Sequence, residues 1–541
     1  MQPPQRPPRL APEGVTREFP PLMVFSRPLR ALGLLWIGLA LPLPAQLAPI
    51  TVPKGLLRLD FAGRFDNWDQ RFLDGIRQDA ATDFAYNPFS ASFLPPLAAA
   101  EAELRRVTGV QAISLSLGKS SSSMLVNVGT ASIGAAYGLT SRLTVFGTVP
   151  IVRVRIQNRF SLDSTDANAG FNPADPTFGN AEGAALTASF LTQLEATLAT
   201  ISGRIAGGAY DGNPAQKALA QQIITQGNPL RTDLKALFET VTFLPVTGSP
   251  AAVSLLTPIE ALQSSIATLD PAFNFTALPA LPARGPGGEE FADFATSPDG
   301  PLAGRPFTPP ILQYIGDIEV GAAFTWLDHR PGSGGIGVRS VLVGTVRLRS
   351  GQLDRPDDFF DIGTGDRQPD VQGDLVTDIA RGRVGARLTA RYVLQLPGRQ
   401  ERRLSSPDHP LAPAASLATV EWDPGEIVEG SFEPFVRIGP TLALTAGVRH
   451  RSKGADHYSY VRNQAPIEDT TPDVLAIGSK QNATALSVGL SFTHEGRRRD
   501  GTVGMPMEAA LRWEKVTRSS RGRVPASESV SMALRFYRRI F

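Results

Sequence analysis

The sequence predicts an all-β protein, an antiparallel transmembrane β-barrel of about 12 strands (about 10 to 14) with an α-helical extracellular insert. Three observations lead to this prediction. Segments with one apolar and one charged face recur along the chain, their connections alternate between short and long, and an apolar run near the N-terminus resembles an export signal. The mean hydropathy of −0.06 fits a barrel, because apolar and polar side chains alternate along each strand.

The segment 317–327 shows the alternation most simply. Successive side chains of a strand point to opposite faces, so every second residue shares a face. One face carries Ile318, Val320, Ala322, Phe324 and Trp326, and the other carries Asp317, Glu319, Gly321 and Thr325. We expect the apolar face to meet lipid and the acidic face to line a lumen, with Asp317 and Glu319 near the outer mouth.

Similar alternation predicts the other strands. Residues 110–117 are a further candidate, which leaves the strand count uncertain by about two. The expected strands are 55–64, 125–137, 142–156, 317–327, 336–349, 370–379, 384–396, 427–438, 442–450, 484–492, 505–513 and 530–541. Within 142–156 the apolar phase changes at Pro150, and because proline lacks a backbone donor we expect a β-bulge there.

The connections between these strands alternate in length. Short turns such as 138–141, 381–383 and 439–440 alternate with long segments such as 158–310 and 451–480. Outer-membrane barrels have short periplasmic turns and longer external loops. An even number of strands then leaves both ends of the barrel in the periplasm, and the expected location is the bacterial outer membrane.

The N-terminal region 1–45 is expected to be a leader and signal peptide. Arg27 and Arg30 precede a short apolar run at 31–43, and Ala45-Gln46 is a suitable cleavage point. An uncleaved membrane anchor is the alternative, although the run is shorter than the roughly 20 residues of a spanning helix.

Three further regions follow the leader. Residues 46–157 contain the first barrel strands with a helical loop at 66–107, where Trp68, Phe72 and Ile76 form a stripe and Pro95 begins a helix. The helical insert or cap at 158–310 has apolar stripes, with helix starts expected at Pro214 and, from a capping box, at Pro258. Residues 311–541 supply the remaining strands.

Composition excludes several classes of function. The net charge of +2 argues against a nucleic-acid-binding surface. The chain has no cysteine and only 5 histidines, so thiolate sites and histidine-rich metal sites are not expected. We expect neither a cofactor nor a bound metal.

Several short motifs resemble a group of bacterial outer-membrane transporter barrels. They are Tyr137-Gly-Leu-Thr-Ser-Arg-Leu143, Gly316-Asp-Ile-Glu-Val-Gly321 and Asp361-Ile-Gly-Thr-Gly-Asp366. The group comprises the phenol-degradation-pathway outer-membrane proteins and, more distantly, the long-chain fatty-acid transporters. The resemblance covers roughly residues 120–160 and 311–541, and it implies passage of a small hydrophobic solute. The C-terminal Phe541 resembles the signal read by barrel-assembly machinery, so membrane lipid and that machinery are the expected partners.

The inward faces of the predicted strands carry charges of both signs. These side chains could form a conduction path whose charges select a solute, or a structural lattice of ion pairs that fills a narrow lumen. The candidate lumen-lining residues are Asp317, Glu319, Arg339, Arg347, Asp374, Asp378, Arg387, Arg391, Glu429, Glu433, Arg437, Glu508 and Arg512. Arg449 and Glu514 share the same faces.

Two local patterns suggest sharper chemistry. The acidic residues around 357–366 could hold Ca²⁺, and the glycines of 361–366 could contact a phosphate, but neither motif has its usual context and an external turn explains both. Asp456, His457 and His450 are the parts that an outer-membrane hydrolase would need. No Gly-x-Ser-x-Gly elbow occurs, so we do not expect an enzyme. A non-transport surface barrel whose insert binds a ligand or partner is the first alternative to transport.

Overall fold

The computed structural model describes residues 50–540, apart from 274, 332–334, 469 and 495–504. The expected signal peptide at 1–45 and the C-terminal Phe541 lie outside the described residues. Among the described residues, no helix has the length and apolar character needed to cross a membrane.

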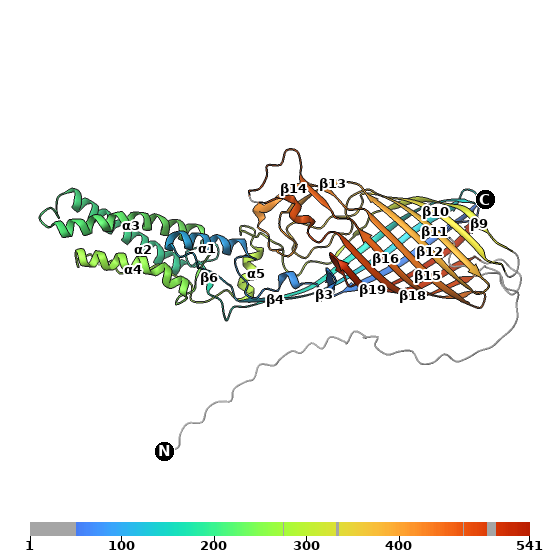
Figure 1. The fold of residues 1–541 in the computed structure, drawn as a ribbon, viewed down its shortest axis with the longest axis horizontal. Helices are drawn as coiled ribbons and strands as arrows, with labels where there is room; N and C mark the ends of the chain where they lie inside the picture. Colours follow the sequence, from blue (N-terminus) through green and yellow to red (C-terminus); the bar gives the residue numbers. More distant parts are fainter. Residues whose placement is uncertain (1–49, 274, 332–334, 469, 495–504, 541) are drawn as a thin grey trace, which may run out of the picture. The chain divides into compact units, whose positions relative to one another are not determined.

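Twelve long antiparallel strands form a closed barrel (Figure 1). Each pairs with two neighbours, and the β1–β4 and β4–β5 pairings close the cylinder. The strands are β1 (Leu56–Trp68), β4 (Lys119–Gly138), β5 (Leu143–Asp163), β9 (Glu319–His329), β10 (Gly337–Arg347), β11 (Asp370–Arg381), β12 (Val384–Gln395), β15 (Ile427–Ile438), β16 (Leu442–Lys453), β18 (Gln481–His494), β19 (Met507–Arg521) and β21 (Glu528–Arg539). The predicted barrel is confirmed.

Residues 110–117 do not add a strand to the barrel. Apart from the isolated bridge between Ser116 and Ser90, they have no β pairing. The short β8 (Leu312–Ile315) does pair with β5, beside the start of β9. The barrel therefore has the even number of strands that puts both of its ends on one side, and Leu56 of β1 pairs with Arg539 of β21 there.

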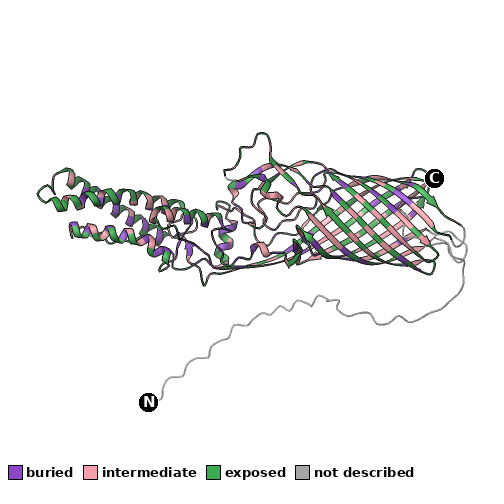
Figure 2. Ribbon diagram, viewed as in Figure 1, coloured by how far each residue is buried: buried purple, intermediate pink, exposed green. Residues whose placement is uncertain are grey.

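The outer surface of the barrel is apolar. On β12, Val384, Leu388 and Tyr392 are exposed, and Phe432 of β15 pairs with Leu388 on the same face. Figure 2 shows the resulting alternation of exposed and less exposed residues along the barrel strands. A closed antiparallel barrel with an apolar exterior leaves no backbone group unpaired in lipid. This is an outer-membrane β-barrel, which locates the chain in the bacterial outer membrane.

The predicted alternation of connections is confirmed. Short turns join β4 to β5, β11 to β12 and β15 to β16, at the end where β1 begins and β21 ends. The connections at the other end are long, except for the one between β19 and β21. Gly382 and Gly439 adopt positive φ angles of 58° and 78°, which a tight turn requires and glycine tolerates.

The bulge expected at Pro150 is absent from the pairing of β5 with β4. On the other edge of β5 the register changes by one residue at this level, from Thr148 opposite Glu319 of β9 to Ile151 opposite Ile315 of β8. β4 and β5 pair without a register shift from Thr144 to Asp163. Val145, Val149 and Ile151 are exposed on the outer face, whereas Val154 and Ile156 are buried in the apolar core that the helices also form. The change of phase in the sequence therefore marks the level at which β5 leaves the lipid zone, not a break in the strand.

The helical stripe expected at Trp68, Phe72 and Ile76 is wrong. Trp68 ends β1, and the next residues form a small sheet of β2 (Gln70–Leu73), β3 (Ile76–Asp79) and β20 (Arg523–Pro525). Asp74 and Gly75 have positive φ angles of 47° and 92°, and an Asp-Gly pair of this kind favours a two-residue hairpin over a helix. The helix expected at Pro95 is confirmed as α1 (Pro95–Thr108).

The chain between β5 and β9 is mainly helical. It contains β6 (Ala169–Phe171), α2 (Ala181–Ala206), α3 (Pro214–Thr240), β7 (Phe243–Pro245), α4 (Pro250–Leu269) and α5 (Gly288–Thr296). The start of α3 at Pro214 is as predicted, but α4 begins before Pro258. Ser249 caps α4 by accepting a hydrogen bond from the Ala252 backbone N–H at 3.2 Å, which supplies a start signal about two turns upstream.

A shared apolar core holds these helices. Its fully buried side chains include Phe190 and Leu194 of α2, Leu234 of α3 and Phe291 of α5. Smaller external elements complete the fold: η1 (Thr82–Phe84), β13 (Gly398–Arg403), η2 (Ala414–Ser416), β14 (Leu417–Asp423), β17 (His457–Tyr460) and η3 (Pro472–Ala476). The core also includes Phe360 from the loop between β10 and β11.

Candidate functional site

Cross-strand ion pairs cover part of the inner wall of the barrel. Arg387 of β12 forms hydrogen bonds of 2.7 and 2.9 Å with Asp378 of β11, its register partner. Arg391 and Asp374, also register partners, lie 2.8 Å apart. These side chains alternate with the exposed apolar residues, so strand geometry directs them inward. Directly opposed opposite charges also stabilise the pairing of the two strands.

A second group of ion pairs extends the lattice to β15, β16 and β19. Glu429 of β15 contacts Arg449 at 2.8 Å and Arg391 at 3.8 Å. Glu514 of β19 contacts Arg449 at 2.5 Å and Arg512 at 3.3 Å. The chain of alternating charges therefore runs from β12 to β19, as the structural-lattice interpretation expects.

Arg512 of β19 also pairs with Glu433 of β15, although β16 and β18 lie between them. Gly447 of β16 makes room for this contact. A Cβ atom at Gly447 would lie 2.5 Å from Ser487 Oγ of β18 and 3.2 Å from Glu433 Cγ, and would be in ordinary contact with Arg512 Nη2 at 3.7 Å. The absence of a side chain on the intervening strand thus lets two long side chains meet inside the barrel.

The other predicted ion-pairing residues lie nearer the ends of the lattice. Arg347 contacts Asp370 at 2.9 Å and Glu319 at 3.5 Å. Glu508 accepts a hydrogen bond of 2.8 Å from the Tyr537 hydroxyl and lies 3.5 Å from Arg535. Ten of the 13 predicted lumen residues therefore take part in ion pairs.

The remaining three predicted residues have different roles. Arg437 donates to the Gly382 carbonyl at 3.0 Å and stacks over the Phe435 ring, and Arg339 donates to Thr51 Oγ1. Asp317 is buried before β9 and accepts hydrogen bonds from the backbone of Gly351 at 2.7 Å and of Asp366 at 3.3 Å. Asp317 therefore anchors the β10–β11 loop.

That loop contains the acidic and glycine-rich motif of the sequence. A Cβ atom at Gly365 would lie 2.4 Å from Asp317 Oδ2, so the glycine permits the loop to close around that carboxylate. Burial raises the pKa of Asp358, of Asp361 and of Asp366. Within the described ranges, no group of three or more His, Cys, Asp or Glu side chains is arranged to hold a metal ion. The motif acts here as a packed loop.

The N-terminal end of the described chain enters the barrel at its short-turn end. Thr51 and Val52 are buried, and the Val52 backbone N–H donates to Thr144 Oγ1 at 2.8 Å. Thr51 Oγ1 lies 3.1 Å from Thr325 Oγ1, and Arg58 donates to the Ile50 carbonyl at 3.2 Å. Thr144 and Thr325 lie on the inner face, so residues 50–52 occupy part of the lumen there. The strand pattern of the sequence does not predict this contact.

The lumen contains a series of neighbouring cavities that share lining residues. A cavity of about 410 Å³ lies at the long-loop end, and one of about 370 Å³ shares Arg64, Arg391, Glu429 and Arg449 with it. The second cavity in turn shares Glu433 and Arg512 with one of about 170 Å³ that Arg387, Glu508 and Arg535 also line. The cavities become smaller toward the short-turn end, where a space of about 40 Å³ lies beside Arg339, Asp378 and Arg437.

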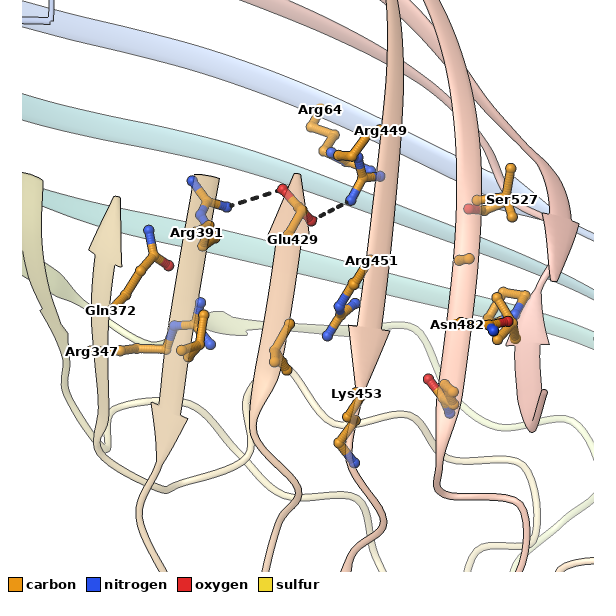
Figure 3. Close-up of a pocket in the computed structure, with 17 residues that line it drawn as sticks. Arg64, Arg347, Gln372, Arg391, Glu429, Arg449, Arg451, Lys453, Asn482 and Ser527 are labelled. Carbon is orange, nitrogen blue, oxygen red and sulfur yellow. Dashed lines mark hydrogen bonds and ion pairs between the residues drawn. The ribbon is translucent and has the colours of Figure 1, made fainter. Parts of the chain in front are cut away.

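The first cavity, which we call the outer cavity, brings together predicted lumen residues and three that are not among them, Arg64, Arg451 and Lys453 (Figure 3). Arg64 continues the phase of the polar residues on β1, and Arg451 and Lys453 continue that of Arg449 on β16. Both strands were predicted to end too early, at residues 64 and 450. Extending the alternation by three residues would have found Arg451 and Lys453.

The candidate hydrolase residues do not come together. Asp456 accepts hydrogen bonds from Lys453 Nζ at 2.5 Å and from the Gly425 backbone at 2.9 Å. His457 begins β17, which pairs with β14 outside the barrel, and His450 contacts Thr484 Oγ1 at 3.0 Å. His450 alternates with the inward-facing Arg449 and Arg451, so it lies on the outer face.

No family model matches this chain, and no curated protein matches it in sequence. Solved structures do match over most of its length. One is an outer membrane channel from Pseudomonas putida F1, with 9% identity, 91% of this chain and 99% of that chain covered, and a TM-score of 0.39. Others are a FadL homologue from Pseudomonas aeruginosa (8% identity, 90% and 91% covered, TM-score 0.27) and the transport unit of the autotransporter AIDA-I from Escherichia coli (5% identity, 91% and 93% covered, TM-score 0.30). The assignment as a barrel rests on the strand pairing of this chain itself.

Proposed function

We propose that this chain is an outer-membrane channel for a small solute with a hydrophobic body. The observation that carries the proposal is the series of cavities that share lining residues along the lumen. The outer cavity, of about 410 Å³, falls in the size range of small-molecule sites. Val393, Ile427, Val516 and Val524 give it an apolar part, which is suited to the body of such a solute.

Passage through this lumen requires side chains to move. The pairs of Arg512 with Glu433 and of Arg387 with Asp378 lie where the cavities become small. The segment 50–52 narrows the short-turn end further. We therefore propose gated passage, in which the charge lattice and the N-terminal segment set the resting width of the lumen.

Single-channel recording in planar bilayers tests the proposal. The purified chain should give small conductance steps, and the double variant Glu433→Gln with Arg512→Gln should give larger steps, because the pair that joins β15 and β19 inside the barrel is removed. The matched control is Arg399→Gln with Glu421→Gln, which removes an exposed 3.0 Å pair between β13 and β14. The control should conduct like the unmodified chain.

Absence of conductance from the unmodified chain and from the Glu433/Arg512 variant, when both migrate as folded barrels on a heat-modifiability gel, would overturn the proposal. The alternative of a non-transport surface barrel would then be preferred. That alternative assigns ligand or partner binding to the helical region between β5 and β9.

A further inference from the structure

Arg451 differs from the other arginines of the outer cavity. Its register partner across β15 and β16 is Glu429, the acidic residue that lines this cavity. Glu429 is already in contact with Arg449 at 2.8 Å and with Arg391 at 3.8 Å, and Figure 3 shows these two ion pairs. Among the described residues, Arg451 forms neither an ion pair nor a hydrogen bond, and its side chain is exposed to the cavity.

Apart from Glu429, the charged residues of the cavity lining are cationic. Arg64, Arg347, Arg391, Arg449 and Lys453 line it together with Arg451. Their other acidic partners, Asp66, Glu319, Asp370, Asp374, Glu514 and Asp456, are not part of the lining. Among the described residues, none of them forms an ion pair with Arg451, and Asp370, Asp374 and Asp456 are buried, at 1%, 8% and 6% exposure.

Neutral side chains complete the polar part of the lining, namely Gln372, Gln481, Asn482 and Ser527. Each of the three amide nitrogens already donates one hydrogen bond, to Asp374, the Arg523 carbonyl and Ser520 respectively, and has a second N–H that could be donated to an anion. A guanidinium that has no carboxylate partner, in a cavity lined by other cations, is suited to a planar or tetrahedral oxyanion, to which it can donate two parallel hydrogen bonds.

We propose that the outer cavity is a binding site for the oxyanion group of a solute, a carboxylate or a phosphate, and that Arg451 determines its affinity. This proposal rests on the proposed function, because it assigns the cavity to the first binding step of the solute that passes. It adds a charge requirement to a solute that is otherwise recognised by its apolar body.

Ligand-observed ¹⁹F NMR on the purified, detergent-solubilised chain tests the site without relying on conductance. The probes are 4-fluorobenzoate for the carboxylate, monofluorophosphate for the phosphate and 4-fluorobenzyl alcohol as the uncharged control. The variant Arg451→Gln should weaken binding of at least one anion about tenfold, which corresponds to ~1.4 kcal/mol and is the lower range for a hydrogen bond to a charged group. Binding of the alcohol should not change.

The variant Arg399→Gln, which alters an exposed arginine outside the cavity, is the matched control and should bind both anions as the unmodified chain does. Binding of 4-fluorobenzoate alone would assign the site to a carboxylate on an apolar body, and binding of monofluorophosphate alone would assign it to a phosphate. The proposal would be overturned if the unmodified chain and Arg451→Gln bound the anions with equal affinity. It would also be overturned if the unmodified chain bound 4-fluorobenzoate and 4-fluorobenzyl alcohol with equal affinity and did not bind monofluorophosphate.

The two proposals fail separately. A chain that conducts but shows no Arg451-dependent anion binding would retain the proposed function and lose the anion site. A chain that binds an anion through Arg451 but gives no conductance would retain the binding site and lose the channel function.

Discussion

The barrel and the helical region bury opposite kinds of side chain. In the helical region, apolar residues such as Phe190, Leu194 and Phe291 are fully buried. In the barrel, large apolar residues such as Leu388 and Phe432 are exposed, whereas Asp374 and Glu508 are buried among arginines. The same hydrophobic effect explains both arrangements, because the outer surface of the barrel faces lipid and that of the helices faces water.

Strand β5 shows the transition within one element. Its outer face carries the exposed Val145, Val149 and Ile151, and further along its inner face carries the buried Val154 and Ile156. The pairing with β4 continues unchanged across this point. A change in apolar phase along a barrel strand can therefore report a change of surroundings, from lipid outside to a protein core inside.

The largest effect is expected in the apolar core of the helical region. Phe190→Ala should reduce the free energy of unfolding of that region by about 3–5 kcal/mol, because a fully buried aromatic side chain is lost and a cavity remains. Hydrogen exchange of α2 to α4 should rise, while the barrel should keep its heat-modifiable migration. Leu186→Ala, on the exposed side of the same helix, is the control and should change stability by less than about 0.5 kcal/mol. Equal effects of the two variants would contradict the assigned core.

The next effect concerns the outer surface of the barrel. Leu388→Arg should destabilise the barrel in phospholipid by about 2–4 kcal/mol. Leu388 is exposed near the middle of β12, so an arginine there would place a charge in the hydrocarbon layer. Reversible guanidinium unfolding in vesicles measures the change. An arginine in place of Leu186, which is exposed on α2, should be tolerated because that surface is assigned to water. Equal losses of unfolding free energy in the two arginine variants would contradict the assignment of the barrel surface to lipid and of the helix surface to water.

A smaller effect is expected inside the barrel. Glu514→Gln removes a carboxylate that contacts both Arg449 and Arg512, at 2.5 and 3.3 Å, and should cost about 1–3 kcal/mol through the charged hydrogen bonds that it loses. The lumen would gain net positive charge, so the reversal potential in a KCl gradient should shift toward anion selectivity. Glu421→Gln, which alters an exposed external residue, is the control and should leave the reversal potential unchanged. A shift toward cation selectivity in Glu514→Gln would contradict the lattice.

The sequence allowed the face of each barrel strand to be predicted, because a period of two needs only local information. The ion pair between Glu433 and Arg512 could not be predicted from the sequence. It depends on the register of two intervening strands and on the missing side chain at Gly447. The role of Asp317 was missed for a similar reason. Its partners, Gly351 and Asp366, belong to a loop whose path no periodicity describes.

The smallest effect should appear where the loop between β10 and β11 meets the apolar core. Phe360 of this loop stacks on Phe84 with ring centroids 4.4 Å apart, and burial raises the pKa of the neighbouring Asp361 above its ordinary value of 3.8. An acid with a raised pKa in the folded loop binds its proton more tightly there than in the unfolded chain. The loop is therefore most stable below about pH 4 and loses stability as the pH rises from there through the raised pKa.

Asp361→Asn should reduce this pH dependence, to which the raised pKa values of Asp358 and Asp366 also contribute, because asparagine does not ionise but keeps an oxygen that can accept the 2.9 Å hydrogen bond from the Arg355 backbone N–H. Hydrogen exchange of residues 355–362, corrected for the intrinsic effect of pH, should show greater protection at pH 5 than at pH 7 in the unmodified chain, with the difference reduced in the variant. Asp299→Asn, an aspartate outside this loop, is the control and should leave the difference intact. Greater protection at pH 7 in the unmodified chain would mean that the ionised carboxylate stabilises the loop, which is the reverse of the effect that burial against the apolar core produces.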